Sequence, residues 1–317
     1  SRDIAAGTPQ PWTPSPHYNQ APLPDELRNY LTHYGSAAFV VVHRGQLLHE
    51  SYFAPYDAHS RTNSFSVAKT ITTLQVGLAV QQGYISSFDA PLTEQLPEYA
   101  RDARGQQATL AQLSSMKAGH DWTENYYLPW NITTDLYFGE HAAELVLSRG
   151  FEREPGTEFE YSSGSTQLLG VFLQRALASK SPGMTISEHL SESLWKPLGM
   201  SRSALYTLDR EASKAGIERT YCCIFATARD FAKVGQLLLQ DGQWQGRPLL
   251  SREFVEFFEN YVPLLIKSLY SVVGALILLA FYDQSLVPIC LGLLLPAVVL
   301  NRIYSRRTFE LSRQLHD

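Results

Sequence analysis

Apolar residues recur at helical spacing over 64–83, the most regular segment of the chain. Every third or fourth position is apolar, which is the period of a buried helix face. The residues that carry this pattern are Val67, Ile71, Leu74 and Leu78. Gly83 follows them and is typical of the residue that ends a helix. The pattern therefore predicts a helix from about Ser66 to Gln82.

Strand and helix patterns alternate through the rest of the first 260 residues. Residues 1–24 hold six prolines and predict an irregular lead-in. A tight turn at Arg44-Gly45 separates two apolar runs, as in a β-hairpin. A Pro-Gly turn and a short strand are predicted before Tyr161. The predicted elements are a helix over 25–33, a hairpin over 37–53, and helices over about 166–179 and 227–240.

The character of the chain changes after Asn260. Two long apolar runs follow, interrupted only near residue 283, and then an arginine-rich tail. We expect a two-helix transmembrane hairpin over 261–304 and a basic tail over 305–317, which makes a lipid bilayer a partner and the membrane the location. A buried core helix is the alternative for each run by itself. The side of the membrane that holds residues 25–260 stays open.

The charge and composition of the chain argue against some classes of function. The 317 residues carry a net charge of -5, and the first 260 hold no basic cluster, so the sequence predicts no nucleic-acid partner. The nine histidines show no metal-ligand spacing, and no metal site is predicted. Two of the three cysteines, Cys222 and Cys223, are adjacent, a geometry that disfavours pairing. The chain begins at Ser1 without methionine, which indicates a processed product or a fragment.

The predicted helix over 66–82 begins with a serine and a lysine three positions apart. Ser66 and Lys69 then lie on one face of the first turn with adjacent side chains. The positive end of the helix dipole disfavours a charged lysine and favours its neutral, proton-accepting form. This pair provides a nucleophile with a base in reach. A capping serine beside a solvated lysine is the alternative, since the S-x-x-K pattern is common.

Several motifs occur in an order that resembles one family. They are SVAK at 66–69, DAPLTEQLPE at 89–98, TLAQLSSMKAG at 109–119, PGTEFEYSSGSTQLLG at 155–170, LWKPLGMSRSAL at 194–205 and ATARDFAKVGQLLLQDG at 226–242. Together they are similar to the serine β-lactamase/penicillin-binding-protein superfamily, in its class C β-lactamase-like branch, which also contains 6-aminohexanoate-oligomer hydrolases and esterases. The resemblance implies an α+β fold with a helical domain and an antiparallel sheet over 25–260.

The resemblance also implies roles for individual residues. Ser66 corresponds to the acylated nucleophile and Lys69 to its helper base. Tyr161 and Ser163 match the family's Tyr-x-Ser element, in which the tyrosine shuttles a proton to the leaving group. An ordinary packed aromatic residue is the alternative for Tyr161. The aromatic segment 120–130 resembles a cleft loop in which Tyr126 faces the substrate, although plugging the core is an equal alternative. No cofactor is implied.

One family element is absent from the sequence. No Lys/His-Thr/Ser-Gly strand follows the helix over 227–240, so the expected sheet is incomplete and one oxyanion-hole donor is missing. Three interpretations stay open: a C-terminally truncated hydrolase joined to a membrane segment, a tethered relative completed by another chain, or a non-catalytic binding domain. The leading function is a serine hydrolase of small amides or esters, in preference to a true β-lactamase. The alternative is a membrane-anchored ligand-binding or scaffold protein.

Overall fold

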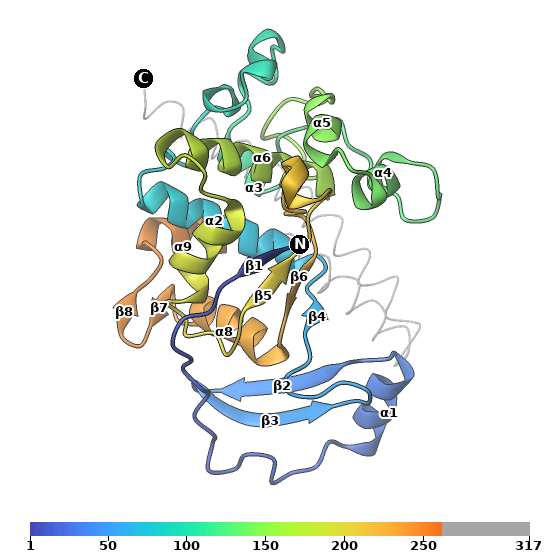
Figure 1. Ribbon diagram of the computed structural model, residues 1–317, viewed down its shortest axis with the longest axis vertical. Coiled ribbons are helices and arrows are strands. Elements are labelled where there is room, and N and C mark those ends of the chain that lie inside the picture. The colour runs from blue at the N-terminus through green and yellow to red at the C-terminus, as the bar shows by residue number, and fades with distance from the viewer. Residues whose placement is uncertain (262–317) are drawn as a thin grey trace, which may run out of the picture. The chain divides into compact units, whose positions relative to one another are not determined.

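Helices α2 and α6 lie next to each other in the middle of the structure (Figure 1). The computed structural model describes residues 1–261, of which 1–255 form one unit and the rest belong to a second. The α-helices are α1 (Asp25–His33), α2 (Val67–Gln81), α3 (Leu110–Ser114), α4 (Ile132–Phe138), α5 (Ala142–Leu147), α6 (Ser163–Lys180), α7 (Ile186–Leu190), α8 (Ala228–Leu239) and α9 (Arg252–Tyr261). Short 3₁₀ helices cover Leu92–Glu94, Pro97–Arg101 and Ala212–Lys214, and a π-helical turn covers Ser191–Trp195.

The strands form three antiparallel sheets within the described residues. They are β1 (Arg2–Ile4), β2 (Ala38–His43), β3 (Gln46–Tyr52), β4 (Thr62–Asn63), β5 (Ala204–Tyr206), β6 (Ile224–Ala226), β7 (Gln243–Trp244) and β8 (Arg247–Pro248). The largest sheet has the order β1-β5-β6-β4, while β2 pairs with β3 and β7 with β8. The β2–β3 register joins Ala38 to Tyr52 and shifts at a bulge between Val41 and Val42. Both the hairpin and its turn were predicted from the sequence and are confirmed.

Helix α2 is buried on nearly every side. Leu74 and Val76 are fully buried although they lie on different faces of the helix. Apolar contact on all sides is what fixes an element at the centre of a fold. The buried residues of α2 include the four that predicted the helix, except that Val67 is half exposed. The predicted bounds, Ser66 to Gln82, differ from the observed ones by one residue at each end.

Three details differ from the sequence-based expectations. The lead-in over 1–24 is not irregular throughout, because Arg2–Ile4 forms β1 beside β5. The expected short strand before Tyr161 is absent among the described strands, and α6 begins three residues early because Ser162 caps it through the backbone N–H of Ser165. Cys222 and Cys223 are joined as a disulfide, contrary to the expectation that adjacent cysteines stay unpaired.

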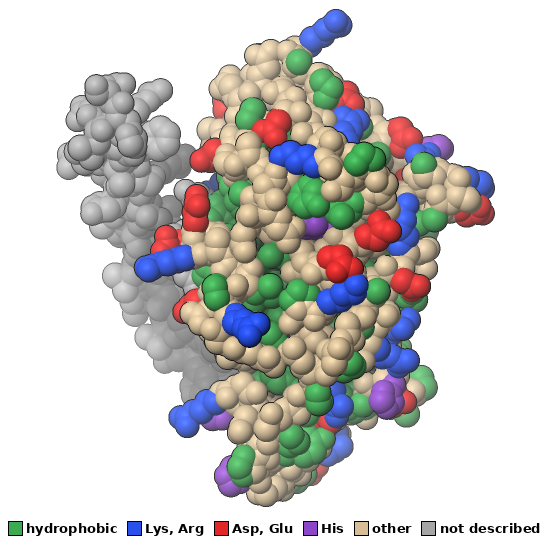
Figure 2. All heavy atoms as spheres, turned by 60° about the vertical axis from the view of Figure 1, so that its left-hand side comes forward, with side chains coloured by type: hydrophobic (Ala, Val, Ile, Leu, Met, Phe, Trp, Pro, Cys, Tyr) green, Lys and Arg blue, Asp and Glu red, His purple; other side chains and the backbone are tan. Residues whose placement is uncertain are grey.

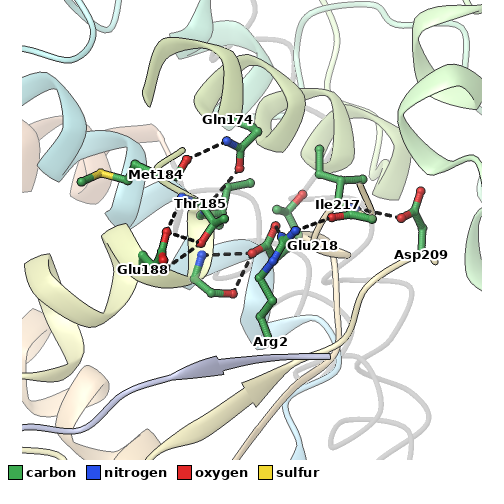
Figure 3. A network of polar contacts seen from close by, with 12 residues as sticks. Arg2, Gln174, Met184, Thr185, Glu188, Asp209, Ile217 and Glu218 are labelled. Atoms are coloured by element: carbon green, nitrogen blue, oxygen red, sulfur yellow. Dashed lines mark hydrogen bonds and ion pairs between the residues drawn. The ribbon is translucent and has the colours of Figure 1, made fainter. Parts of the chain in front are cut away.

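A buried carboxylate joins β1 to residues 218–221. Glu218 is fully buried; its Oε1 accepts hydrogen bonds from the backbone N–H and hydroxyl of Ser187, and its Oε2 lies 2.9 Å from the Arg2 guanidinium. Figure 3 shows Arg2 and Glu218 facing each other within this network. The Glu218 carbonyl accepts from Gln167 of α6. These contacts fix the position of residues 218–221, which reach the candidate site.

Charged side chains on the surface are mixed in sign. In the view of Figure 2, lysines and arginines are interspersed with aspartates and glutamates. Many of them are paired, as Arg175 is with Glu98 and Arg210 with Glu144. Exposed pairs of this kind contribute little to the free energy of unfolding, about 0–1 kcal/mol each.

Among the residues that the structure describes, no helix combines the length and apolar character needed to cross a membrane. The predicted transmembrane hairpin over 261–304, apart from Tyr261 at the end of α9, lies outside the described residues, as does the tail over 305–317. The fold of residues 1–261 is α+β, as expected, with the hairpin β2–β3 as a two-stranded sheet of its own.

Candidate active site

A strained turn between β4 and α2 presents Ser66. Phe65 has φ +41°, a left-handed conformation that side chains other than glycine rarely adopt. Its backbone N–H donates to Asn63 Oδ1. The N–H of the neighbouring Ser64 donates to the carbonyl of Ile224 in β6, and the Ser64 hydroxyl oxygen accepts from the Ile224 N–H. These contacts hold the turn in place, so that Ser66 stands at the N-cap of α2 beside the cavity.

The Ser66 hydroxyl is in contact with both predicted proton-transfer groups. Tyr161 donates a hydrogen bond of 2.6 Å from its hydroxyl to Ser66 Oγ, and Lys69 Nζ donates one of 3.3 Å. Tyr161 comes from the segment just before α6, 95 residues away in sequence from Ser66. The structure thus brings together Ser66, Lys69 and Tyr161, although their catalytic roles stay predictions. The arrangement can pass a proton between the serine and either neighbour.

Lys69 is buried and oriented by its surroundings. Only 7% of it is exposed, and its Nζ also donates to the backbone carbonyl of Tyr221 at 2.9 Å. The same nitrogen lies 4.9 Å from the centre of the Tyr161 ring and 5.7 Å from that of Tyr221. Burial raises the pKa of Tyr221 to about 12, so its phenol stays neutral beside the lysine. Lys69 is therefore confined to one position, directed at Ser66.

Glu124 organises the opposite wall of the site. Its carboxylate accepts hydrogen bonds from the Ser163 backbone N–H at 2.9 Å and the Ser163 hydroxyl at 2.6 Å. It also accepts from the Tyr126 hydroxyl and from Trp122 Nε1. Burial, followed by the hydrogen bond to Glu124, raises the pKa of Tyr126 above its usual range. The four acceptor positions of the carboxylate are thus occupied.

The loop over 120–130 contributes to both the core and the site, where the sequence left these as alternatives. Trp122 is 2% exposed and fills the space against α6, while Tyr126 is 69% exposed at the cavity. The start of the loop is therefore buried in the core, and its aromatic residues from Tyr126 onward are exposed. The structure places the two predicted substrate-binding residues, Tyr126 and Ser163, on the cavity wall next to Ser66.

A cavity of about 470 Å³ opens beside these groups. This volume lies within the range of small-molecule sites. The sequence predicted five residues of this site. It did not predict other residues that line the cavity, among them Phe65, Tyr137, Phe138, Tyr221 and Cys222. It also missed Glu124, since only the spatial proximity of the loop to the start of α6 reveals its role.

The backbone N–H of Ser66 is the candidate donor for a developing oxyanion. Within residues 1–261, the backbone N–H of Ser66 donates a hydrogen bond to no other group. Backbone N–H groups at a helix N-terminus stabilise negative charge, as an oxyanion hole requires. No group of three or more metal-ligating side chains occurs among the described residues. A serine hydroxyl in contact with a lysine and a tyrosine, as Ser66 is here, is an arrangement that can support acyl transfer.

The fold and the arrangement of this site are those of the β-lactamase and penicillin-binding type. The family model described as Beta-lactamase matches residues 25–257, so the chain belongs to the β-lactamase family. The chain is 29% identical over 247 residues to 6-aminohexanoate-dimer hydrolase of Paenarthrobacter ureafaciens, an alignment that covers 74% of this chain and 59% of that protein. The chain thus aligns with less than two thirds of its curated relative.

Solved structures share the fold. A structure from Bacillus anthracis, provisionally assigned as a 6-aminohexanoate-dimer hydrolase, superposes with a TM-score of 0.68 at 24% identity and covers 82% of this chain and 70% of its own. A family VIII carboxylesterase superposes with a TM-score of 0.57 at 17% identity, covering 77% and 75%. At this level of identity the likeness establishes the α+β fold of the family, and the substrate is a separate question.

Proposed function

We propose that this chain is a serine hydrolase that forms an acyl-enzyme through Ser66 on an amide or ester. The contact of Ser66 Oγ with both Lys69 and Tyr161 is the observation that carries the proposal. The named activities of the similar proteins, an amide hydrolase and a carboxylesterase, support this class of substrate. A true β-lactamase activity is less well supported, because Ser163 stands where the family's penicillin-directed members carry asparagine.

In the proposed reaction, Ser66, Lys69 and Tyr161 have separate roles. Ser66 Oγ attacks the substrate carbonyl carbon while its proton passes to Lys69 or Tyr161. The Ser66 N–H stabilises the resulting oxyanion. Tyr161 returns the proton to the leaving nitrogen or oxygen as its bond to the carbonyl carbon breaks. Water then attacks the acyl carbon, releasing the acid and restoring the Ser66 hydroxyl.

Labelling with a fluorophosphonate probe tests the proposal. We expect the wild-type protein to become labelled at Ser66, and Ser66→Ala to remain unlabelled. Ser87→Ala, which changes an exposed serine away from the cavity, should label as the wild type does. Equal labelling of wild type and Ser66→Ala would exclude Ser66 as the nucleophile.

A non-catalytic ligand-binding protein is the second candidate. It is favoured by the expectation from the sequence that no Lys/His-Thr/Ser-Gly element follows the helix over 227–240, since the loss of one oxyanion donor would lower turnover by about 10²–10³-fold. Hydrolysis of a 4-nitrophenyl ester that disappears in Ser66→Ala excludes this candidate. A protein that binds the ester without such turnover supports it.

We further propose that residues 261–304 attach the chain to a membrane as a two-helix hairpin. Two apolar runs separated by Asp283-Gln284-Ser285 and followed by arginines support this proposal. The full chain should then stay in the membrane pellet after carbonate extraction. A version that ends at residue 260 is expected in the supernatant; recovery of the full chain there would contradict the proposal.

A further inference from the structure

The mouth of the cavity beside Ser66 is aromatic. Of the five lining side chains that carry a benzene ring, Tyr221 is buried and the other four are between 38% and 76% exposed to solvent. These four rings form the mouth. They are Phe65, Tyr126, Tyr137 and Phe138. Rings exposed in this way around a cavity offer apolar surface to whatever enters it.

The same lining offers no countercharge to a substrate. Apart from Lys69, the described lining residues are aromatic, serine, threonine, asparagine and cysteine. Lys69 already donates to Ser66 and to the Tyr221 carbonyl. An ammonium group on the substrate would therefore find no acidic partner among these residues, and a carboxylate would find only Lys69, which is 7% exposed and already held by two hydrogen bonds.

Two charged side chains behind the cavity wall already form hydrogen bonds with other groups of the protein. Glu124 lies behind Ser163 and Tyr126, and all four acceptor positions of its carboxylate are taken. Arg219, behind α4, is 6% exposed and donates through its three nitrogens to backbone carbonyls. These are the carbonyls of Leu136, Tyr137, Gly139, Leu208 and Asp209. Neither group is available to bind a charged substrate.

We infer that this site takes an uncharged ester or amide whose apolar arm lies against Phe65, Tyr137 and Phe138. The inference rests on the proposed acyl-enzyme function and narrows its substrate class. It also separates this chain from its relative named as a 6-aminohexanoate-dimer hydrolase, because a linear 6-aminohexanoate dimer carries charge at both ends. The discriminating groups are the aromatic side chains and the absence of a countercharge among the described lining residues.

Matched esters test the inference directly. 4-Nitrophenyl pentanoate and mono-4-nitrophenyl glutarate differ only in a methyl group replaced by a carboxylate. The 4-nitrophenyl esters of 7,7-dimethyloctanoate and 6-(trimethylammonio)hexanoate provide the same comparison for a cation, which aromatic rings could attract. We expect kcat/KM to be at least tenfold higher for the neutral ester of each pair. A preference for either charged ester overturns the inference.

A substitution that supplies a countercharge provides the second test. Phe138→Arg should raise kcat/KM for the glutarate ester by about tenfold relative to the pentanoate ester. Leu239→Arg introduces the same charge at an exposed position of α8 outside the cavity and should leave the ratio unchanged. An equal change in both variants would show that the ratio reflects overall charge and not the cavity.

The outcomes separate the inference from the function on which it rests. If no ester is hydrolysed in a Ser66-dependent way, the proposed function fails. Binding of N-phenylpentanamide and N-phenylglutaramic acid to Ser66→Ala then measures the same discrimination without chemistry. Preference for the neutral amide supports the inference, and equal or reversed affinity overturns it.

Discussion

Glu124 concentrates four hydrogen bonds from three residues on one carboxylate. Two of these residues, Ser163 and Tyr126, line the cavity, and the third, Trp122, is buried behind them. A carboxylate accepts at both oxygens without donating, so it suits a position surrounded by N–H and O–H groups. In the proposed function Glu124 is thus a positioning residue for the wall that faces Ser66, and none of its four hydrogen bonds involves Ser66.

Glu124→Gln is expected to lower kcat/KM for a neutral ester by about 10–100-fold. The amide NH₂ of glutamine would face a hydrogen-bond donor at a position where the carboxylate accepts, and this would displace Ser163. One buried donor would also lose its acceptor, which typically costs about 1–3 kcal/mol in free energy. The steady-state kinetics of the purified variant measure this effect. Glu154→Gln, which changes an exposed glutamate paired with Arg104, serves as the control and should be unaffected.

Labelling of Glu124→Gln by a fluorophosphonate distinguishes positioning from unfolding. The variant should still label at Ser66, because Lys69 and Tyr161 form hydrogen bonds with the serine and neither forms one with Glu124 within the described part of the chain. Wild-type kcat/KM in the variant would contradict the assigned role of Glu124.

At the scale of single residues, the sequence predicted the groups that share a local pattern. Ser66 and Lys69 are three positions apart on one helix turn, so their contact follows from helix geometry. Tyr161 came from the resemblance to a family and not from spacing. Glu124 could not be found either way, since its partner Ser163 is 39 residues distant and their contact depends on how the loop folds back.

The start of α6 shows how one element positions another. A Cβ on Gly164 would overlap the ring atoms of Trp122, so only glycine allows the loop to pack this closely on the helix. Trp122 Nε1 in turn donates to Glu124 at 2.8 Å. The fit of the glycine against the indole thus sets the position of the polar wall of the site.

Gly164→Ala is expected to destabilise the protein by about 1–3 kcal/mol, the usual cost of overpacking a filled core. It should also lower kcat/KM, because displacement of Trp122 moves Glu124. Gly235→Ala in α8 is the matched control: a methyl group there would meet no atom within 4 Å, and alanine favours the helix by about 0.5–1 kcal/mol. Urea denaturation of both variants measures the difference. Equal stability of the two would contradict this account of α6.

Elements with a strong local pattern were predicted well, and contacts between elements were not. Helix α1 and the hairpin β2–β3 have the predicted positions because periodicity and a Gly turn are local signals. Strand β1 was missed because its pairing partner, β5, lies about 200 residues later in the chain. A proline-rich lead-in gives no local sign that three of its residues will join a sheet.

At the scale of the whole described unit, Glu50 joins the lead-in, the hairpin and α8. Its carboxylate accepts hydrogen bonds from Tyr18 at 2.5 Å, Tyr52 at 2.8 Å and Arg229 Nε at 2.7 Å. Burial alone would raise the pKa of Glu50, but the hydrogen bonds from Arg229, Tyr18 and Tyr52 outweigh it and lower the pKa to about 2. Segments far apart in the sequence are therefore fixed by one ionised group.

This lowered pKa predicts a defined pH dependence. A carboxylate with a lower pKa in the folded state stabilises it above the unfolded pKa of 4.5, and the stabilisation is lost as the pH falls toward about 2. We expect Glu50→Gln to lower the free energy of unfolding by about 2 kcal/mol at pH 7. The difference from wild type should shrink between pH 4.5 and 2. Urea denaturation of both proteins across this range measures it.

The difference curve isolates Glu50 from other buried groups. Burial lowers the pKa of His120 and His189 to about 4, so both reduce stability as the pH falls below 6.5. This contribution is common to wild type and Glu50→Gln and cancels. Glu98→Gln, at an exposed pair with Arg175, is the control and should change stability by less than about 1 kcal/mol. A difference independent of pH would contradict the role given to Glu50.

Tyr221 holds Lys69 through its main chain and lines the cavity with its side chain. No amino-acid substitution removes the carbonyl oxygen, whereas every substitution changes the cavity wall. A survey of tolerated mutations would therefore record position 221 as part of the cavity wall and would overlook the contact of its carbonyl group with the lysine. A replacement at position 221 therefore changes the cavity wall and the ring beside Lys69, while it keeps the carbonyl group that accepts a hydrogen bond from the lysine.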